Sequence, residues 1–114
     1  MSVKLTTRQV GDVTVIDAVG RITLGDGAST FRDTIRSLAA AGHKKLLLNL
    51  AEVSYIDSSG IGEMVSGFTT ITNQGGVVKL LGLNKRVKDL LQITKLYTVF
   101  EVFDDEAGAV GSFA

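Results

Sequence analysis

The chain has 114 residues, 45% of them hydrophobic, and its twelve lysines and arginines balance twelve aspartates and glutamates. This length suits one hydrophobic core, and the hydrophobic content argues against a disordered chain. A neutral chain lacks the positive charge that binding to a nucleic-acid backbone requires, so no nucleic-acid partner is expected. Cysteine is absent, which excludes disulfides, thiolate zinc sites and thiol catalysis.

The N-terminal segment has no apolar signal core. No stretch approaches the ~18 consecutive apolar residues of a membrane-spanning helix. We therefore expect a cytoplasmic protein without membrane insertion, and a monomer that forms one domain over residues 1–114.

Two strands joined by a tight turn are predicted first. Residues 3–9 alternate weakly between apolar and polar types, and residues 13–19 are rich in β-branched side chains. Gly11 and Asp12 lie between these segments and form a turn pair that accepts positive φ. The pattern predicts a β-hairpin.

A helix is predicted after the hairpin. Apolar residues recur at helical spacing from Ala28 to Leu38, and Gly42 marks the expected end. Ser29 and Asp26 are the two candidates for the N-cap.

Strands and helices alternate through the second half of the chain. A nearly continuous apolar run predicts a strand at residues 45–50 that is covered on both faces. Further expected elements are a helix with an apolar stripe from Ile61 to Ile71, a strand at 77–81, a helix at 85–91, a strand at 98–103 and a final helical turn after Asp104. This alternation predicts an α/β fold, with a central mixed β-sheet of four to five strands packed by helices.

The most specific motif is Asp57-Ser58-Ser59-Gly60-Ile61-Gly62, which directly follows an apolar segment ending at Ile56. It places two hydroxyls in the first turn of a helix, where unpaired backbone N–H groups and the helix dipole favour negative charge. A phosphate on either serine is therefore tolerated locally while it changes the surface offered to a partner. A structural alternative stays open, in which Asp57 or Ser58 caps the helix, for about 1 kcal/mol, and the glycines allow close packing.

Other chemistries lack the residues that they need. The single histidine, His43, precedes the strand at 45–50 whereas the serines follow it, so no catalytic triad is expected. One histidine and scattered carboxylates make no convincing metal site, and Gly25-Asp26-Gly27 lacks the lysine of a phosphate-binding loop. We therefore expect no metal, no cofactor and no enzymatic activity.

A small basic cluster lies on the helix expected at 85–91 and consists of Lys85, Arg86 and Lys88. Such a cluster is either a solvated helix face or a contact for an acidic partner.

The segment from Val53 to Gly62 resembles the phosphorylation segment of the STAS domain of bacterial anti-sigma-factor antagonists. The resemblance extends over nearly the whole chain, from the N-terminal strands to the helix at 85–91. It implies a single STAS domain over residues 1–114. It also implies that Ser58, immediately after the aspartate, is the phosphorylated residue, with Ser59 a weaker candidate. The expected flanking and partner-binding residues are Asp57, Ser59, Gly60, Ile61 and Gly62.

The resemblance further implies a phosphoprotein that regulates transcription by partner switching. Unphosphorylated, it binds an anti-sigma factor with serine kinase activity, and a sigma factor is released. The kinase then phosphorylates Ser58, the complex loosens, and a serine phosphatase resets the cycle. The kinase supplies ATP and metal, so this chain supplies only the acceptor.

One departure and several alternatives accompany the resemblance. Family members often carry Gly-Glu-Leu-Asp after the second strand, where this chain has Gly20-Arg21-Ile22-Thr23. The loss of those carboxylates changes the charge near the site and thereby the kinase that is expected to recognise it. The same fold also serves as a scaffold subunit of stress-signalling assemblies and as an accessory subunit of lipid transporters. A hydrolase is the enzyme-class alternative.

Overall fold

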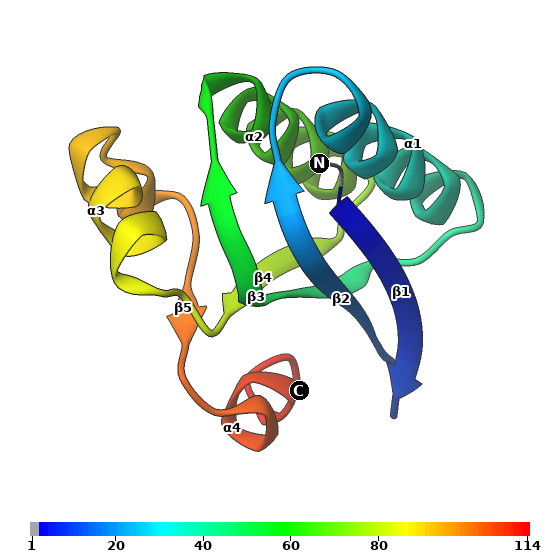
Figure 1. The fold of residues 1–114 in the computed structure, drawn as a ribbon. Coiled ribbons are helices and arrows are strands. Elements are labelled where there is room, and N and C mark those ends of the chain that lie inside the picture. Colours follow the sequence, from blue (N-terminus) through cyan, green and yellow to red (C-terminus); the bar gives the residue numbers. More distant parts are fainter. Residues whose placement is uncertain (1–2) are drawn as a thin grey trace.

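The computed structural model describes residues 3–114. Strands and helices alternate along the chain after an N-terminal hairpin (Figure 1). In chain order the elements are β1 (Val3–Val10), β2 (Val13–Ile22), α1 (Asp26–Ala40), β3 (Lys45–Ile56), α2 (Ser58–Asn73), β4 (Val77–Leu81), α3 (Lys85–Ile93), the 3₁₀ helix η1 (Leu96–Thr98), β5 (Val102–Phe103) and α4 (Glu106–Gly111).

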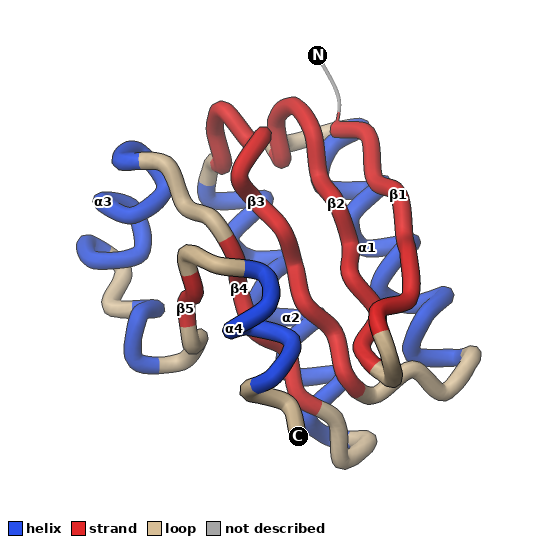
Figure 2. Tube along the Cα trace, turned by 90° about the horizontal axis from the view of Figure 1, so that it is seen from below, coloured by secondary structure: helices blue, strands red, loops and turns tan. Residues whose placement is uncertain are grey.

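The sheet has five strands in the order β1-β2-β3-β4-β5. β1 pairs antiparallel with β2, and the other neighbours are parallel, so the predicted mixed sheet is confirmed. Helices α1 and α2 cover one face, and α4 lies across part of the other (Figure 2). α3 stands beside the sheet on the far side of β3 from β2 (Figure 1). The parallel strands end at one edge, which is where the serine motif begins.

Two apolar clusters hold these layers together. The larger lies between the sheet and α1 and α2, and it includes Ile22, Phe31, Leu48, Ile56 and Ile71. The smaller lies beneath α4; its buried members are Val13, Val15, Leu47, Leu81 and Ala109.

An ion-pair cluster ties the hairpin to α4. Arg8 on β1 donates to Asp17 on β2 at 2.7 Å and also to Glu106 at the start of α4. These contacts lower the pKa of both carboxyl groups, with the bond from Arg8 as the main cause. α4 is therefore held by charge as well as by apolar contact.

The largest difference from the sequence-based prediction is the length of β3. The strand was expected at residues 45–50, yet it continues to Ile56. Its second half pairs with the end of β2, where Arg21 lies opposite Tyr55 and Ile22 lies opposite Ile56. The backbone pairing with β2 extends the strand through a stretch whose polar residues weaken the apolar pattern.

Two further predictions were wrong. Neither Ser29 nor Asp26 caps α1, because the N-cap is Gly25 at φ 95° and no side chain bonds the helix start. The last strand was expected at 98–103 but comprises only Val102–Phe103. Thr98 instead ends the short 3₁₀ helix, which follows Lys95 at φ 60°, and residues 99–101 form neither helix nor strand.

Candidate functional site

Ser58 is the first residue of α2, and only Asp57 separates it from the end of β3. Its side chain is exposed to solvent. Within residues 3–114 the Ser58 hydroxyl makes no hydrogen bond, although three neighbouring residues are bonded across the same turn. The hydroxyl is thus accessible to an incoming enzyme and has no structural bond to lose.

Asp57 is the N-cap of α2, which decides between the two cap candidates. Its Oδ1 accepts the Gly60 N–H at 2.9 Å, and its Oδ2 accepts the Leu24 N–H at 2.9 Å. The Leu24 and Gly60 N–H donors hold the pKa of the Asp57 carboxyl below its usual range. One carboxylate therefore joins the β2–α1 turn to the start of α2, and Ser58 is left free.

Gly60 permits a very close approach between α2 and the end of β2. A Cβ at this position would clash with the carbonyl oxygen of Ile22 and lie 2.7 Å from Cγ2 of Ile56. Gly27 plays the same part for α1, since its Cβ would lie 2.6 Å from the Arg21 carbonyl oxygen. Both helices thus start against the backbone at the end of one strand.

Gly62 has no such internal role. A Cβ there would meet nothing within 4 Å in the part of the chain that the structure describes, and the residue is exposed at the beginning of the second turn of α2. Close internal packing, one of the alternatives for the two glycines, therefore explains Gly60 and does not explain Gly62.

Ser59 differs from Ser58 in its surroundings. It is half-buried, and it lies one helical turn before Glu63, which accepts a hydrogen bond from Arg32 of α1 at 3.4 Å. Ser59 is therefore the less exposed of the two serines, and it lies near the Arg32–Glu63 pair that joins α1 and α2.

The start of α2 offers fewer free donors than the sequence suggested. The Gly60 N–H is bonded to the Asp57 carboxylate, and the Ile61 N–H is bonded to the Asp57 carbonyl. A phosphate on Ser58 would also stand next to the Asp57 carboxylate. The added charge would consequently point outward to the surface rather than be absorbed by the helix terminus.

Leu24 lies beside the serine motif, and the sequence analysis did not single it out. It lies in the turn between β2 and α1, its backbone is bonded to Asp57, and its side chain is 79% exposed. The one available signal was a large apolar residue in an otherwise polar turn. Leu24 and Ser58 therefore flank Asp57 on the same edge of the molecule.

His43 lies at the other end of the sheet, as expected. Its Nδ1 is 2.9 Å from the Thr14 hydroxyl, and Thr14 pairs with Leu46 at the beginning of β3. No group of three or more histidine, aspartate or glutamate side chains in residues 3–114 is arranged to hold a metal ion. None of the helices in that range combines the length and the apolar character that a membrane crossing requires.

Comparison with known proteins identifies the family. A family model described as the STAS domain matches residues 4–109. The chain belongs to the STAS domain family. This STAS domain is 35% identical over 83 residues to the anti-sigma-B factor antagonist of Bacillus subtilis (strain 168). The matched segment covers 73% of this chain and 75% of that relative.

Solved structures confirm the STAS-like α/β fold. The crystal structure of an anti-sigma factor antagonist from Mycobacterium paratuberculosis matches with a TM-score of 0.88 and 15% identity, covering 98% of this chain and 94% of that one. The structure of the Bacillus cell fate determinant SpoIIAA in its phosphorylated form matches with a TM-score of 0.77 and 18% identity. This match covers 97% of this chain and 100% of that one. At these identities the likeness establishes the fold of the STAS domain.

Replacing Asp57 by alanine should destabilise the STAS domain by about 1 kcal/mol at pH 7, the usual value of a lost N-cap. Because the pKa of Asp57 is lowered in the folded state, its stabilisation is complete above the unfolded value of about 3.9 and is lost as the pH falls through the folded pKa. Urea unfolding of both proteins at pH 7 and in acid measures the difference. A difference that stays constant or grows in acid would contradict the role of the ionised cap.

Proposed function

We propose that this STAS domain is an antagonist of an anti-sigma factor and that phosphorylation of Ser58 switches its binding. The unphosphorylated form binds an anti-sigma factor with serine kinase activity, and the sigma factor is released to RNA polymerase. The kinase transfers the γ-phosphoryl group of ATP to Ser58 Oγ, ADP leaves, and the complex loosens. A serine phosphatase hydrolyses the phosphate ester and restores the binding form.

The observation that carries this proposal is the exposed, unbonded hydroxyl of Ser58 at the start of α2. Phosphorylation adds about −1.5 to −2 charges at pH 7. The cap of α2 is Asp57, so the helix keeps its N-terminal bonds when Ser58 is modified. The fold is therefore expected to persist, while a partner that had covered a neutral hydroxyl must now desolvate a dianion.

The surroundings of Ser58 suit a protein contact. Leu24, with its side chain 79% exposed, lies on the other side of Asp57 and offers an apolar anchor. Gly62, at the beginning of the second turn of α2, presents no side chain, although no neighbour among residues 3–114 requires a glycine there. A partner that reached Ser58 would bury Leu24 and approach the backbone at Gly62.

In this scheme the chain acts as a phosphate acceptor and not as an enzyme. The kinase contributes the nucleotide, the metal ion and the catalytic base, so the STAS domain needs no cofactor. Its site of action is the cytoplasm, where sigma factors meet RNA polymerase.

Intact-mass spectrometry after mixing with candidate anti-sigma kinases and ATP tests the proposal. We expect a gain of one phosphate in the wild type and in Ser59→Ala, and no gain in Ser58→Ala. Phosphate found on Ser59, or a gain that persists in Ser58→Ala, would overturn the assignment of Ser58.

A further inference from the structure

A groove runs between the end of β3 and helix α3, next to the serine motif. Its volume is about 480 Å³, and its apolar lining comes from Tyr55, Ile56, Val87, Leu90 and Ile93. Its charged lining residues are Lys85, Arg86 and Asp89. This volume lies within the range of about 300–1,000 Å³ typical of ligand sites. Tyr55 and Ile56 directly precede the Asp57 cap, so the groove opens at the same edge of the sheet as Ser58.

The groove leaves large apolar side chains in contact with water. Ile93 at the end of α3 is 80% exposed, and the Tyr55 ring is 40% exposed. Apolar side chains that stay exposed beside a groove are typical of a surface that binds a partner protein, and an amphipathic helix lays its apolar face into such a groove.

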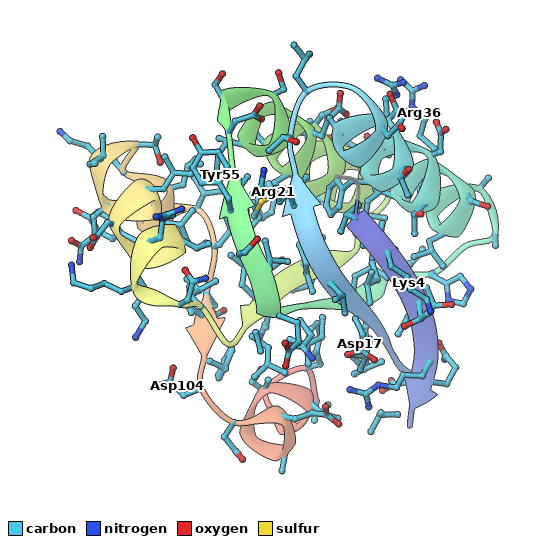
Figure 3. All side chains as sticks on the ribbon, viewed as in Figure 1. Lys4, Asp17, Arg21, Arg36, Tyr55 and Asp104 are labelled. Carbon is cyan, nitrogen blue, oxygen red and sulfur yellow. The ribbon has the colours of Figure 1, made fainter. Side chains whose placement is uncertain are left out.

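The charges at the groove leave a positive excess, because Asp89 in its lining is paired with Lys85 and, among residues 3–114, Arg86 is not paired. The Arg86 guanidinium lies 5.7 Å from the centre of the Tyr55 ring, and Arg21 is the register partner of Tyr55 on the neighbouring strand. Figure 3 shows Arg21 and Tyr55 near one another at the ends of β2 and β3. In residues 3–114 neither Arg21 nor Arg86 forms an ion pair, whereas the nearby Lys85 is paired with Asp89 at 3.0 Å. Two unneutralised guanidinium groups thus flank one aromatic ring.

We propose that the groove between β3 and α3 docks an acidic polypeptide segment with apolar anchor side chains. The anchors fill the space between Tyr55 and Ile93, and carboxylates of the segment pair with Arg86 and Arg21. This docking does not require the Ser58 hydroxyl, and it goes beyond the phosphorylation switch.

Two synthetic peptides of equal length serve as probes. Both carry leucines at helical spacing; one has glutamates and the other lysines at the remaining charged positions. Titration into the ¹⁵N-labelled protein is expected to shift the amide signals of residues 55–56 and 85–93 with the acidic peptide. We expect the acidic peptide to bind at least about tenfold tighter than the basic one, with an affinity that falls as salt is added.

Substitutions on the groove and matched substitutions elsewhere locate the contact. Arg86→Glu and Ile93→Ser should each weaken the acidic peptide about tenfold. Arg36→Glu, on α1 at the opposite side of the molecule in Figure 3, and Val77→Ser, at the start of β4, should leave its affinity unchanged. All four side chains are exposed, so these variants are expected to fold, and circular dichroism checks this.

The Ser58→Ala variant separates this proposal from the phosphorylation switch. It accepts no phosphate at position 58 and adds no charge beside the groove, so it should bind the acidic peptide as tightly as the wild type. The docking proposal is overturned if the lysine peptide binds equally well, if the shifts lie elsewhere, or if no shift appears at millimolar peptide. Tight binding of dodecanoate with no binding of either peptide would likewise overturn it in favour of a lipid site.

Discussion

Replacing Ser58 by glutamate is expected to weaken binding of the anti-sigma factor more than a hundredfold, whereas alanine at this position should preserve the affinity. The wild-type hydroxyl is exposed and bonds to nothing within residues 3–114, so its removal costs the free protein no interaction. A carboxylate at the same place must be desolvated when the partner covers it. A desolvation penalty of about 3 kcal/mol would weaken the affinity more than a hundredfold, because each 1.4 kcal/mol of binding free energy corresponds to a factor of ten. Isothermal titration calorimetry with the purified kinase measures both variants.

Two controls show whether a loss of affinity comes from the charge at position 58, from a change in stability or from the net charge of the protein. Both variants should unfold at the same urea concentration as the wild type, because Asp57 and not Ser58 caps α2. Ser37→Glu places the same charge on an exposed serine of α1 and should leave the affinity unchanged. Equal affinities of Ser58→Ala and Ser58→Glu, or an equal loss in Ser37→Glu, would defeat the proposed switch.

Local sequence signals were enough to predict the order of the elements. Gly11 adopts φ 63° in the predicted hairpin turn, and Gly42 adopts φ 85° at the predicted end of α1. The helical stripe from Ile61 to Ile71 correctly indicated α2. In each case the deciding interaction lies within a few residues, so a pattern in the chain carries it.

The largest error arose where a distant segment decides the local structure, and two smaller errors have local causes. β3 continues past Leu50 because the end of β2 pairs with it, after a register shift between Asp17 and Val19. The strand expected at 98–103 is shorter because the 3₁₀ helix ends only at Thr98 and an irregular segment follows it up to residue 101. Gly25 starts α1 without a side-chain cap, since the Ala28 N–H finds the Thr23 carbonyl instead.

Only the local part of the candidate site was predicted, because its other contacts join segments that are distant in the sequence. The serine motif and its position at a helix start follow from residues that are adjacent in the chain. The contact of Leu24 with Asp57 and that of Gly60 with Ile22 join the β2–α1 turn to α2. These contacts appear only once β2 and β3 lie side by side, and they define which surface surrounds Ser58.

Replacing Gly60 by alanine is expected to be the most damaging single substitution near the site. The new methyl group would clash with the Ile22 carbonyl oxygen, which already accepts a hydrogen bond from the Asp57 N–H. A backbone oxygen at the end of a paired strand cannot move aside as a flexible side chain can. Overpacking of a buried position typically costs about 1–3 kcal/mol, and the most severe cases exceed about 4 kcal/mol. We expect Gly60→Ala near the upper end of this range, measured by urea unfolding.

Gly62→Ala is the matched control, because the same methyl group would meet nothing within 4 Å. It should be neutral or should stabilise α2 by up to about 1 kcal/mol, the helix-propensity difference between the two residues. If Gly60→Ala folds at all, α2 must move away from β2, and the bond between Asp57 and the Leu24 N–H must lengthen or break. Binding of the anti-sigma factor should then fall although Ser58 itself is intact. Equal stability of the two alanine variants would show that the start of α2 is not seated on β2, and the surface around Ser58 would have to be redrawn.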